Sequence, residues 1–251
     1  MSMISPDDQH TIRKLFEELE DDVTITNFTQ RESLLLVPGQ ECSYCQETRE
    51  LLEEVTDLSE KLHVETKDFV RDKQEADRLG ITRIPAFVLQ GRAKGVVRYF
   101  GIPAGYEFST LIEDLIDISK GRTNLNDKTR EVLAKLSQDL HIQVFVTPTC
   151  PYCPRAARLA HQLAVENEHV TADVVEISEF VEMAQRYRVQ GVPKTVVNDY
   201  IEIVGALPEA RFIQQIFTAL DQEETQHPPA SAGASDHTRK VVALSPCPSN
   251  C

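Results

Sequence analysis

The sequence predicts an α/β protein built from two tandem domains of the same kind. The first observation is a repeated cysteine pair, CSYC at 42–45 and CPYC at 150–153, with 108 residues from one pair to the next. The second is a repeated proline, because Pro193 follows Pro85 by the same 108 residues. The third is that the apolar segments occur in the same order in both halves. A period this long indicates two whole domains rather than a solenoid, whose repeats run at roughly 20–50 residues.

In the first half, apolar residues at helical spacing between Ile12 and Leu19 predict an opening helix. The apolar run SLLLV at 33–37 predicts a strand that leads directly into the first cysteine pair. The pair should be followed by a helix around 51–58 and by a strand around 63–69. A short helix, two strands after Pro85 and a last helix complete the half.

The second half gives the same order of elements. An opening helix is predicted around 132–140, and the run HIQVFV at 141–146 predicts the strand before the second cysteine pair. A helix around 157–164 and a strand at 170–177 follow, and a short helix, two strands after Pro193 and a final helix end the half. Each half therefore reads, after its opening helix, as β-α-β-α-β-β-α.

Breaks in these patterns predict the boundaries of the domains. The segment GRTNLND at 121–127 separates the halves, and Asp127 is expected to cap the helix that follows it. We therefore expect one domain over 1–121 and a second over 122–220. Residues 221–251 contain the run HPPASAGASD and are expected to form a disordered tail.

Composition excludes several classes of function. The chain has 251 residues, of which 41% are hydrophobic, and a formal net charge of −14. Such a charge disfavours nucleic acids and anionic membranes as partners, because phosphate binding depends on Lys and Arg. The first residues, MSMISPDDQH, include no apolar run that would form a signal peptide or membrane anchor. We therefore expect a cytoplasmic protein.

Six cysteines are too few for a disulfide-stapled secreted scaffold, and in a reducing compartment such pairs are more often catalytic or metal-binding. Zinc is the main structural alternative. Zinc ribbons, however, place their two pairs roughly 15–20 residues apart, so the much longer separation here predicts no metal site. His63, His141, His161 and His169 also show no ligand spacing to one another.

The repeated C-x-x-C motif and the repeated Ile/Val-Pro pairs in one register resemble the thioredoxin superfamily. Two such copies, with CPYC in the second and YFGIPAG at 99–105 closing the first, resemble the protein disulfide oxidoreductases, which are tandem glutaredoxin-like proteins. The resemblance implies two thioredoxin-like domains, each with a central mixed β-sheet flanked by helices. It also implies that Pro85 and Pro193 follow cis peptide bonds beside the cysteines, with the backbone of Ile84 and Val192 free to pair with an extended substrate.

Disulfide exchange needs a thiolate, and a helix N-terminus stabilises one through its free N–H groups and its dipole. The pattern places Cys42 and Cys150 at such helix starts, with Pro151 at the first helical position. We therefore expect Cys42 and Cys150 to be the attacking thiols and Cys45 and Cys153 to be the resolving thiols. Tyr44 and Tyr152, between the cysteines, are expected to be packing residues.

The surroundings of the two pairs suggest that they differ. Glu41, Glu47 and Glu50 surround the first pair with only Arg49, whereas Arg155 and Arg158 follow the second. We therefore expect Cys150 to be the more acidic thiol and to meet protein substrates, while the first pair exchanges electrons with it or with a reductase.

Thioredoxin itself carries a buried Asp on the strand before its cysteines, but the positions six before Cys42 and Cys150 hold Leu36 and Val144. A thioredoxin-style buried proton acceptor is therefore not expected on these strands. Asp68 and Glu176, on the neighbouring strands, are alternative proton relays.

The predicted function is protein dithiol–disulfide exchange in cell redox homeostasis, without a tightly bound cofactor. By resemblance, electrons would come from NAD(P)H through a thioredoxin-reductase-like flavoprotein. Two alternatives stay open, a dedicated electron donor to a peroxiredoxin and a non-catalytic binding module of the same fold. Cys247 and Cys251 near the C-terminus form a third pair, predicted to be auxiliary redox residues or incidental thiols.

Overall fold

A computed structural model describes residues 2–30 and 42–226, with side chains described to residue 220. The first half contains α1 (Pro6–Leu15), the 3₁₀ helix η1 (Phe16–Glu18), β1 (Val23–Thr29), α2 (Cys45–Thr56), β2 (Leu62–Asp68), α3 (Lys73–Arg78), β3 (Ala86–Gln90), β4 (Val96–Phe100) and α4 (Glu107–Lys120). The second half contains α5 (Asp127–Leu133), β5 (Leu140–Val146), α6 (Cys153–Glu166), β6 (Val170–Glu176), α7 (Val181–Arg186), β7 (Lys194–Val197), β8 (Ile201–Val204) and α8 (Glu209–Gln226). The mixed α/β order predicted for each half is therefore confirmed.

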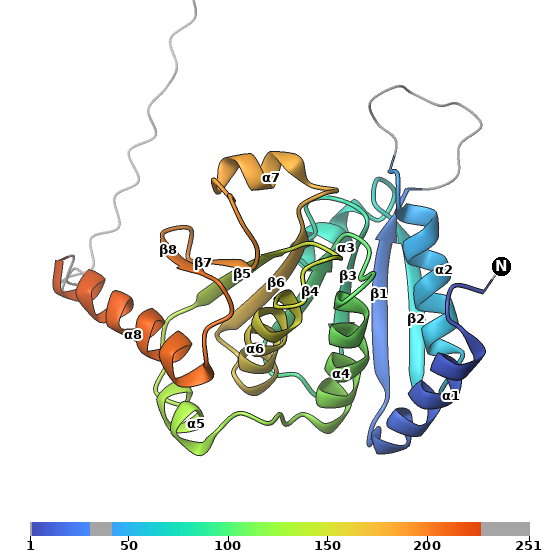
Figure 1. The fold of residues 1–251 in the computed structure, drawn as a ribbon, viewed down its shortest axis with the longest axis horizontal. Coiled ribbons are helices and arrows are strands. Elements are labelled where there is room, and N and C mark those ends of the chain that lie inside the picture. The colour runs from blue at the N-terminus through green and yellow to red at the C-terminus, as the bar shows by residue number, and fades with distance from the viewer. Residues whose placement is uncertain (1, 31–41, 227–251) are drawn as a thin grey trace, which may run out of the picture.

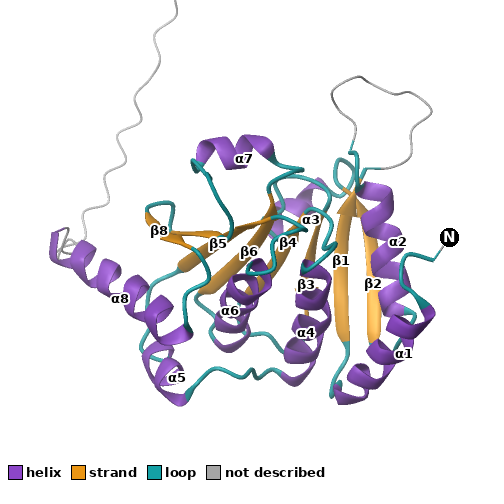
Figure 2. Ribbon diagram, in the orientation of Figure 1, coloured by secondary structure: helices purple, strands orange, loops and turns teal. Residues whose placement is uncertain are grey.

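The strands of both halves form one continuous sheet in the order β2-β1-β3-β4-β6-β5-β7-β8 (Figures 1 and 2). Within each half the sheet is mixed, since β1 is parallel to β2 and antiparallel to β3, and β5 is parallel to β6 and antiparallel to β7. The halves meet where β4 pairs in parallel with β6, from Val96 opposite Thr171 to Phe100 opposite Val175. Each half thereby covers an edge strand that would otherwise carry unpaired backbone groups.

The two faces of this sheet are covered unequally. On one face, the larger apolar cluster joins buried residues of α1, α2, α4, α6 and α8 to strand residues such as Ile25, Leu89 and Val144. On the other face, a smaller cluster includes Phe28, Phe145, Ala76 of α3 and Met183 of α7. This assignment follows from the alternation of side chains along each strand.

The loop between β3 and β4 fastens the halves together. Backbone N–H groups of Lys94 and Gly95 donate hydrogen bonds to the carbonyl oxygens of Val165 and Ala164, at the C-terminal end of α6. The equivalent hairpin of the second half is shorter, with a turn of only three residues between β7 and β8. The longer hairpin of the first half therefore forms a contact between the halves.

Helix boundaries follow local chemistry. Ser5 caps α1 by accepting the N–H of Asp8, and Pro6 occupies the first turn. Gly121 ends α4 at φ +63°, a left-handed conformation that suits glycine. The cap of α5 differs from the prediction, because the side chain of Asn126 accepts the N–H of Thr129 while Asp127 is the first helical residue.

One strand of the first half was missed from the sequence. The strand that occupies the position of β5 is β1, Val23–Thr29, and twelve residues separate its end from Cys42. The sequence predicted that the cysteine pair directly follows its strand. In this half it does not. The predicted strand at 33–37 lies outside the described residues. At the other end, α8 continues to Gln226, beyond the residue at which the tail was expected to begin.

Among the described residues, none of the helices is long and apolar enough to cross a lipid bilayer.

Candidate active site

Both cysteine pairs lie at the same edge of the sheet. Strands β1, β4, β6 and β5 all run in the same direction, and the pairs follow the carboxyl ends of β1 and β5. These two strands are four positions apart in the sheet. At about 4.8 Å per strand, the two sites are separated by roughly 19 Å.

The second pair is deeply placed. Cys150 and Cys153 form a disulfide with 5.5 Å between their Cα atoms, and their exposed fractions are 8% and 0%. The Val192–Pro193 peptide bond is cis, as the resemblance implied. The sulfur of Cys150 lies 3.7 Å from the carbonyl oxygen of Val192, so the attacking sulfur and the proline loop are in direct contact.

The first pair has a matching arrangement. Cys42 and Cys45 form a disulfide, again with 5.5 Å between their Cα atoms, and the Ile84–Pro85 bond is cis. Gln30 holds both cysteines, since its N–H lies 3.3 Å from the sulfur of Cys45 and its side-chain oxygen accepts the N–H of Cys42 at 2.9 Å. Cys45 is buried and Cys42 is partly exposed, so the outer sulfur belongs to Cys42.

The helices start later than predicted. α2 begins at Cys45 and α6 at Cys153, so Cys42 and Cys150 lie one turn before the first helical residue. The reason is a tight turn, in which the N–H of Cys153 reaches the carbonyl of Cys150 before α-helical bonding begins. Proline occupies the first turn of α6 as Pro154, not as Pro151. The Cys150 sulfur remains at the helix N-terminus because it is bonded to Cys153.

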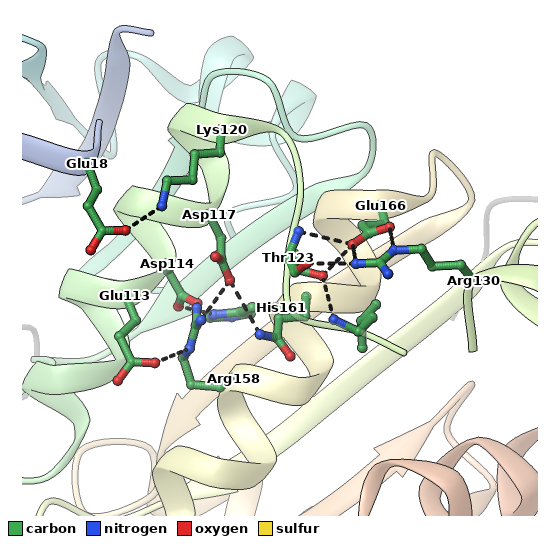
Figure 3. A network of polar contacts seen from close by, with 12 residues as sticks. Glu18, Glu113, Asp114, Asp117, Lys120, Thr123, Arg130, Arg158, His161 and Glu166 are labelled. Carbon is green, nitrogen blue, oxygen red and sulfur yellow. Dashed lines mark hydrogen bonds and ion pairs between the residues drawn. The ribbon is translucent and has the colours of Figure 1, made fainter. Parts of the chain in front are cut away.

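The predicted charge difference between the sites is only partly present. Arg158 does not act as a free cation near Cys150, because it forms ion pairs with Glu113, Asp114 and Asp117 of α4 (Figure 3). Arg155 is exposed to solvent. The prediction considered only residues near Arg158 in the sequence. It therefore missed the acids of α4, which the first half brings to α6.

The predicted proton relays have another role. The carboxylate of Glu176 accepts the N–H groups of Ser178 and Glu179, and that of Asp68 accepts the N–H groups of Val70 and Arg71. Both acids therefore terminate their strands by closing the turn that follows. These contacts do not test whether either acid relays protons, which stays a prediction.

The tyrosines between the cysteines are not packing residues. Tyr44 and Tyr152 expose 45% and 70% of their surface, because each lies in the turn between two cysteines and faces outward. Each cysteine pair therefore has one exposed tyrosine beside it. Cys247 and Cys251 lie outside the described residues.

Sequence reasoning missed one buried acid, Glu107. Its side chain is 0% exposed and both carboxylate oxygens lack hydrogen-bond partners. Burial raises its pKa to about 7, although the nearby Thr110 hydroxyl group and, after it, the His161 ring oppose this shift. The hydroxyl group of Tyr99 is also buried without a partner, and burial together with Glu107 raises the pKa of that phenol.

The loop that closes the first half, directly before Glu107, contacts the segment that leads into the second pair. The N–H of Tyr106 donates to the carbonyl of Pro148 at 3.0 Å, two residues before Cys150. A Cβ atom on Gly105 would collide with that same carbonyl, so only glycine allows the approach. Glu107 follows directly, and its side chain is fully buried in the interior. Its signal in the sequence was the run YFGIPAGYEF, interpreted there only as a turn.

Within the described residues, no group of three or more His, Cys, Asp or Glu side chains could hold a metal ion.

Comparison with known proteins supports a redox role. Residues 140–218 match the thioredoxin domain family, and residues 9–102 match a domain of unknown function, DUF7088. A component of the alkyl hydroperoxide reductase of Staphylococcus aureus is 25% identical over 154 residues, which cover 61% of this chain and 27% of that protein. An NADH dehydrogenase of Bacillus subtilis is 23% identical over 59% of this chain and 27% of its own length. The chain thus spans about a quarter of the length of the curated relatives it matches.

Solved structures resemble the chain over most of its length. A protein disulfide oxidoreductase from Aeropyrum pernix has a TM-score of 0.77 and 28% identity, and the match covers 87% of this chain and 94% of that one. The alkylhydroperoxide reductase AhpF of Enterococcus faecalis has a TM-score of 0.75 and 23% identity, covering 84% of this chain and 98% of that one.

A thioredoxin-like fold that carries C-x-x-C disulfides beside cis-prolines defines a thiol–disulfide oxidoreductase. The second half of the chain matches the thioredoxin domain family, and the chain as a whole is similar in fold to a protein disulfide oxidoreductase.

Proposed function

We propose that the chain is a protein dithiol–disulfide oxidoreductase with its principal site at Cys150 and Cys153. The observation that carries this proposal is the contact between the Cys150 sulfur and the Val192 carbonyl beside a cis-proline. This geometry presents a redox-active sulfur next to a backbone edge. An extended client can pair with the backbone of Val192 while its disulfide meets Cys150. Ile84 and Pro85 would serve the first pair in the same way.

The reaction begins from the dithiol form. The Cys150 thiolate attacks one sulfur of the client disulfide, an S–S bond forms between them, and the other client sulfur leaves as a thiolate. Cys153 then loses its proton and attacks Cys150, which releases the second client thiolate and closes the Cys150–Cys153 disulfide. Two electrons pass from the enzyme to the client, and a reductant must return two electrons to reopen the disulfide.

Glu107 is the proposed proton acceptor in the second step. Cys153 has no exposed surface, so its proton requires an acceptor inside the protein. With its pKa raised to about 7, the Glu107 carboxyl group can both take and return a proton near neutral pH. The buried acid absent from the strand before Cys150 is thus replaced by one from the other half.

Similarity to the relatives supports a proposal for the source and the destination of the electrons. A partner flavoprotein reductase, drawing on NAD(P)H, is the proposed donor, and protein disulfides are the proposed clients. A second candidate is a dedicated electron donor in hydroperoxide reduction, including one to a peroxiredoxin, favoured by the similarity to the alkyl hydroperoxide reductase of Staphylococcus aureus. The proposed location is the reducing cytoplasm. The proposed domains of the duplication are residues 1–121 and residues 122–220.

Insulin reduction with dithiothreitol tests the function. We expect Cys150→Ser to abolish activity and Cys42→Ser to retain part of it, since the second pair is the proposed principal site. A Cys247→Ser/Cys251→Ser variant tests whether the third pair takes part. If the parent reduces only a peroxiredoxin, the dedicated donor is the better assignment. If the parent binds unfolded clients without any exchange, the binding-module alternative replaces both.

A further inference from the structure

Each half has a corner beside its proline loop, formed by the two residues that follow the second strand of its hairpin. The first corner is Gly101 and Ile102, and the N–H of Gly101 donates to the carbonyl oxygen of Pro85 at 2.8 Å. The second corner is Gly205 and Ala206, and the N–H of Gly205 donates to the carbonyl oxygen of Pro193 at 2.8 Å. Both glycines have a positive φ, +101° and +84°. The two corners therefore match in their backbone contacts, and their surroundings can be compared directly.

The second half of the chain fills the first corner. A Cβ atom on Gly101 would lie 2.7 Å from Oε1 of Glu179 and 2.7 Å from Cβ of Glu176. The same oxygen of Glu179 accepts the N–H of Ile102 at 2.6 Å. Gly101 and Ile102 are both buried. The backbone donor that follows the glycine is therefore already in use.

The turn after β6 carries Glu179 to this corner. The carboxylate of Glu176 accepts the N–H groups of Ser178 and Glu179 at 2.9 Å each, at the end of the strand that pairs with β4. The duplication places Arg71 at the position of Glu179, 108 residues earlier. Arg71 is exposed, because β2 lies at the edge of the described sheet. The contact at the first corner therefore depends on the junction between the halves.

The second corner is open. Nothing lies within 4 Å of the place that a Cβ atom on Gly205 would occupy. Among the described residues, no group accepts the N–H of Ala206, and both residues of this corner are partly exposed. The reason is that β8 is the last strand of the described sheet, so no turn from a neighbouring strand reaches the corner. The second corner thus offers a client a backbone donor that the first corner has already used.

We propose that Glu179 is a specificity-determining residue that competes with extended clients for the backbone donor beside the first proline loop. The inference rests on the proposed pairing of clients with the backbone of Ile84 and Val192. A client paired with either residue passes the neighbouring corner, because the glycine of that corner is bonded to the adjoining proline. At the second corner a client carbonyl accepts the free N–H, whereas at the first it must displace Glu179. The first pair therefore binds extended clients more weakly than the second.

The test uses enzymes that keep one working pair, with insulin as the client. Cys150→Ser/Cys153→Ser leaves only the first pair. In this enzyme we expect Glu179→Ala to lower KM for insulin about fivefold, the effect of one net hydrogen bond, with little change in kcat. Glu179→Gln keeps an acceptor for the Ile102 N–H and should retain the KM of the enzyme with Glu179.

The second pair is the internal control. In the Cys42→Ser/Cys45→Ser enzyme, Glu179→Ala should leave KM unchanged, because the second corner is already open. The inference is overturned if Glu179→Ala leaves KM of the first pair unchanged or lowers KM of both pairs equally. It is also overturned if Glu179→Gln lowers KM as much as Glu179→Ala does. If the enzyme with only the second pair reduces no insulin, the proposed function fails instead.

A binding measurement on the parent protein covers a variant that fails to fold. The probe is the insulin B chain with alkylated cysteines, titrated into ¹⁵N-labelled oxidised protein and followed by NMR. We expect the amide resonance of Ala206 to shift at a lower peptide concentration than that of Ile102, because only the Ala206 N–H is free. Equal midpoints for the two amides would overturn the inference.

Discussion

At the scale of single residues, Glu107 makes the stability of the fold depend on pH. Its pKa of about 7 exceeds the usual value of 4.5, so the folded state holds a proton that the unfolded state releases between these values. The unfolded state then binds fewer protons, and the free energy of unfolding falls as pH rises from about 4.5 to 7. Below pH 4.5 both states are protonated and the cost disappears.

Glu107→Gln should remove this dependence. The difference in free energy of unfolding between the variant and the parent should grow in favour of the variant by about 2 kcal/mol from pH 5 to pH 8. The reason is that the variant no longer forms a buried charge. Urea denaturation of the oxidised proteins at both pH values measures the difference. Glu131→Gln is the control, since Glu131 is exposed on α5, and it should give the same difference from the parent at both pH values.

Arg158 stabilises the fold because it pairs with buried carboxylates. Arg158→Met removes the cation shared by Asp114 and Asp117 and leaves two buried carboxylates facing each other across the same space. We expect the free energy of unfolding to fall by about 3–5 kcal/mol, measured by urea denaturation at pH 7. Arg155→Met, one turn earlier on the same helix and exposed, should change it by less than about 0.5 kcal/mol. Equal losses in the two variants would contradict this account.

At the scale of elements, the hairpin before β4 determines how closely the halves approach. A Cβ atom on Gly95 would collide with the carbonyl oxygens of Ala164, Asn167 and Val170, all of them backbone atoms of the second half. We expect Gly95→Ala to lower the free energy of unfolding by about 2 kcal/mol, since backbone cannot move aside as a side chain can. Thermal unfolding measures the loss. Gly191→Ala is the control and should unfold like the parent, because a Cβ atom there meets nothing within 4 Å.

Several elements could be predicted from the sequence because their signals are local. The doubled cysteine pairs, the two prolines and the apolar runs of β5 and β6 gave the order of each half correctly. β1 was missed because VTITNFT alternates with polar residues while the nearby SLLLV is more apolar. Threonine is a common strand residue even though it is polar, so hydrophobicity alone did not find β1.

The missed parts of the active site depend on contacts between the halves. Glu107 is 43 residues from Cys150 in sequence, and its neighbour Tyr106 contacts Pro148 only in the folded chain. The contact of α4 with α6 neutralises Arg158, which along the chain has no acidic neighbour. The cysteines and their prolines can be found along the chain, but not the groups that reach them from the other half.

At the scale of the whole molecule, the shared sheet should make unfolding cooperative. β4 and β6 pair along five residues each, and Arg98 of β4 binds Asp173 of β6 at 2.6 Å in a buried ion pair. Unfolding of one half would therefore expose a sheet edge and a buried charge in the other. We expect amide hydrogen exchange in low urea to give the same opening free energy for β1 and β5. A lower value for β1 would show that the first half opens by itself.

The twist of the sheet has a consequence for how clients are arranged. Neighbouring strands rotate by about 20–25°, so four steps from β1 to β5 turn the two sites by roughly 80–100° relative to each other. A straight polypeptide lying along one proline loop therefore points across the other and cannot occupy both. If both proline loops bind extended clients as proposed, the two bound segments would lie at roughly a right angle, so one client could stay at the first site while a second protein binds at the other.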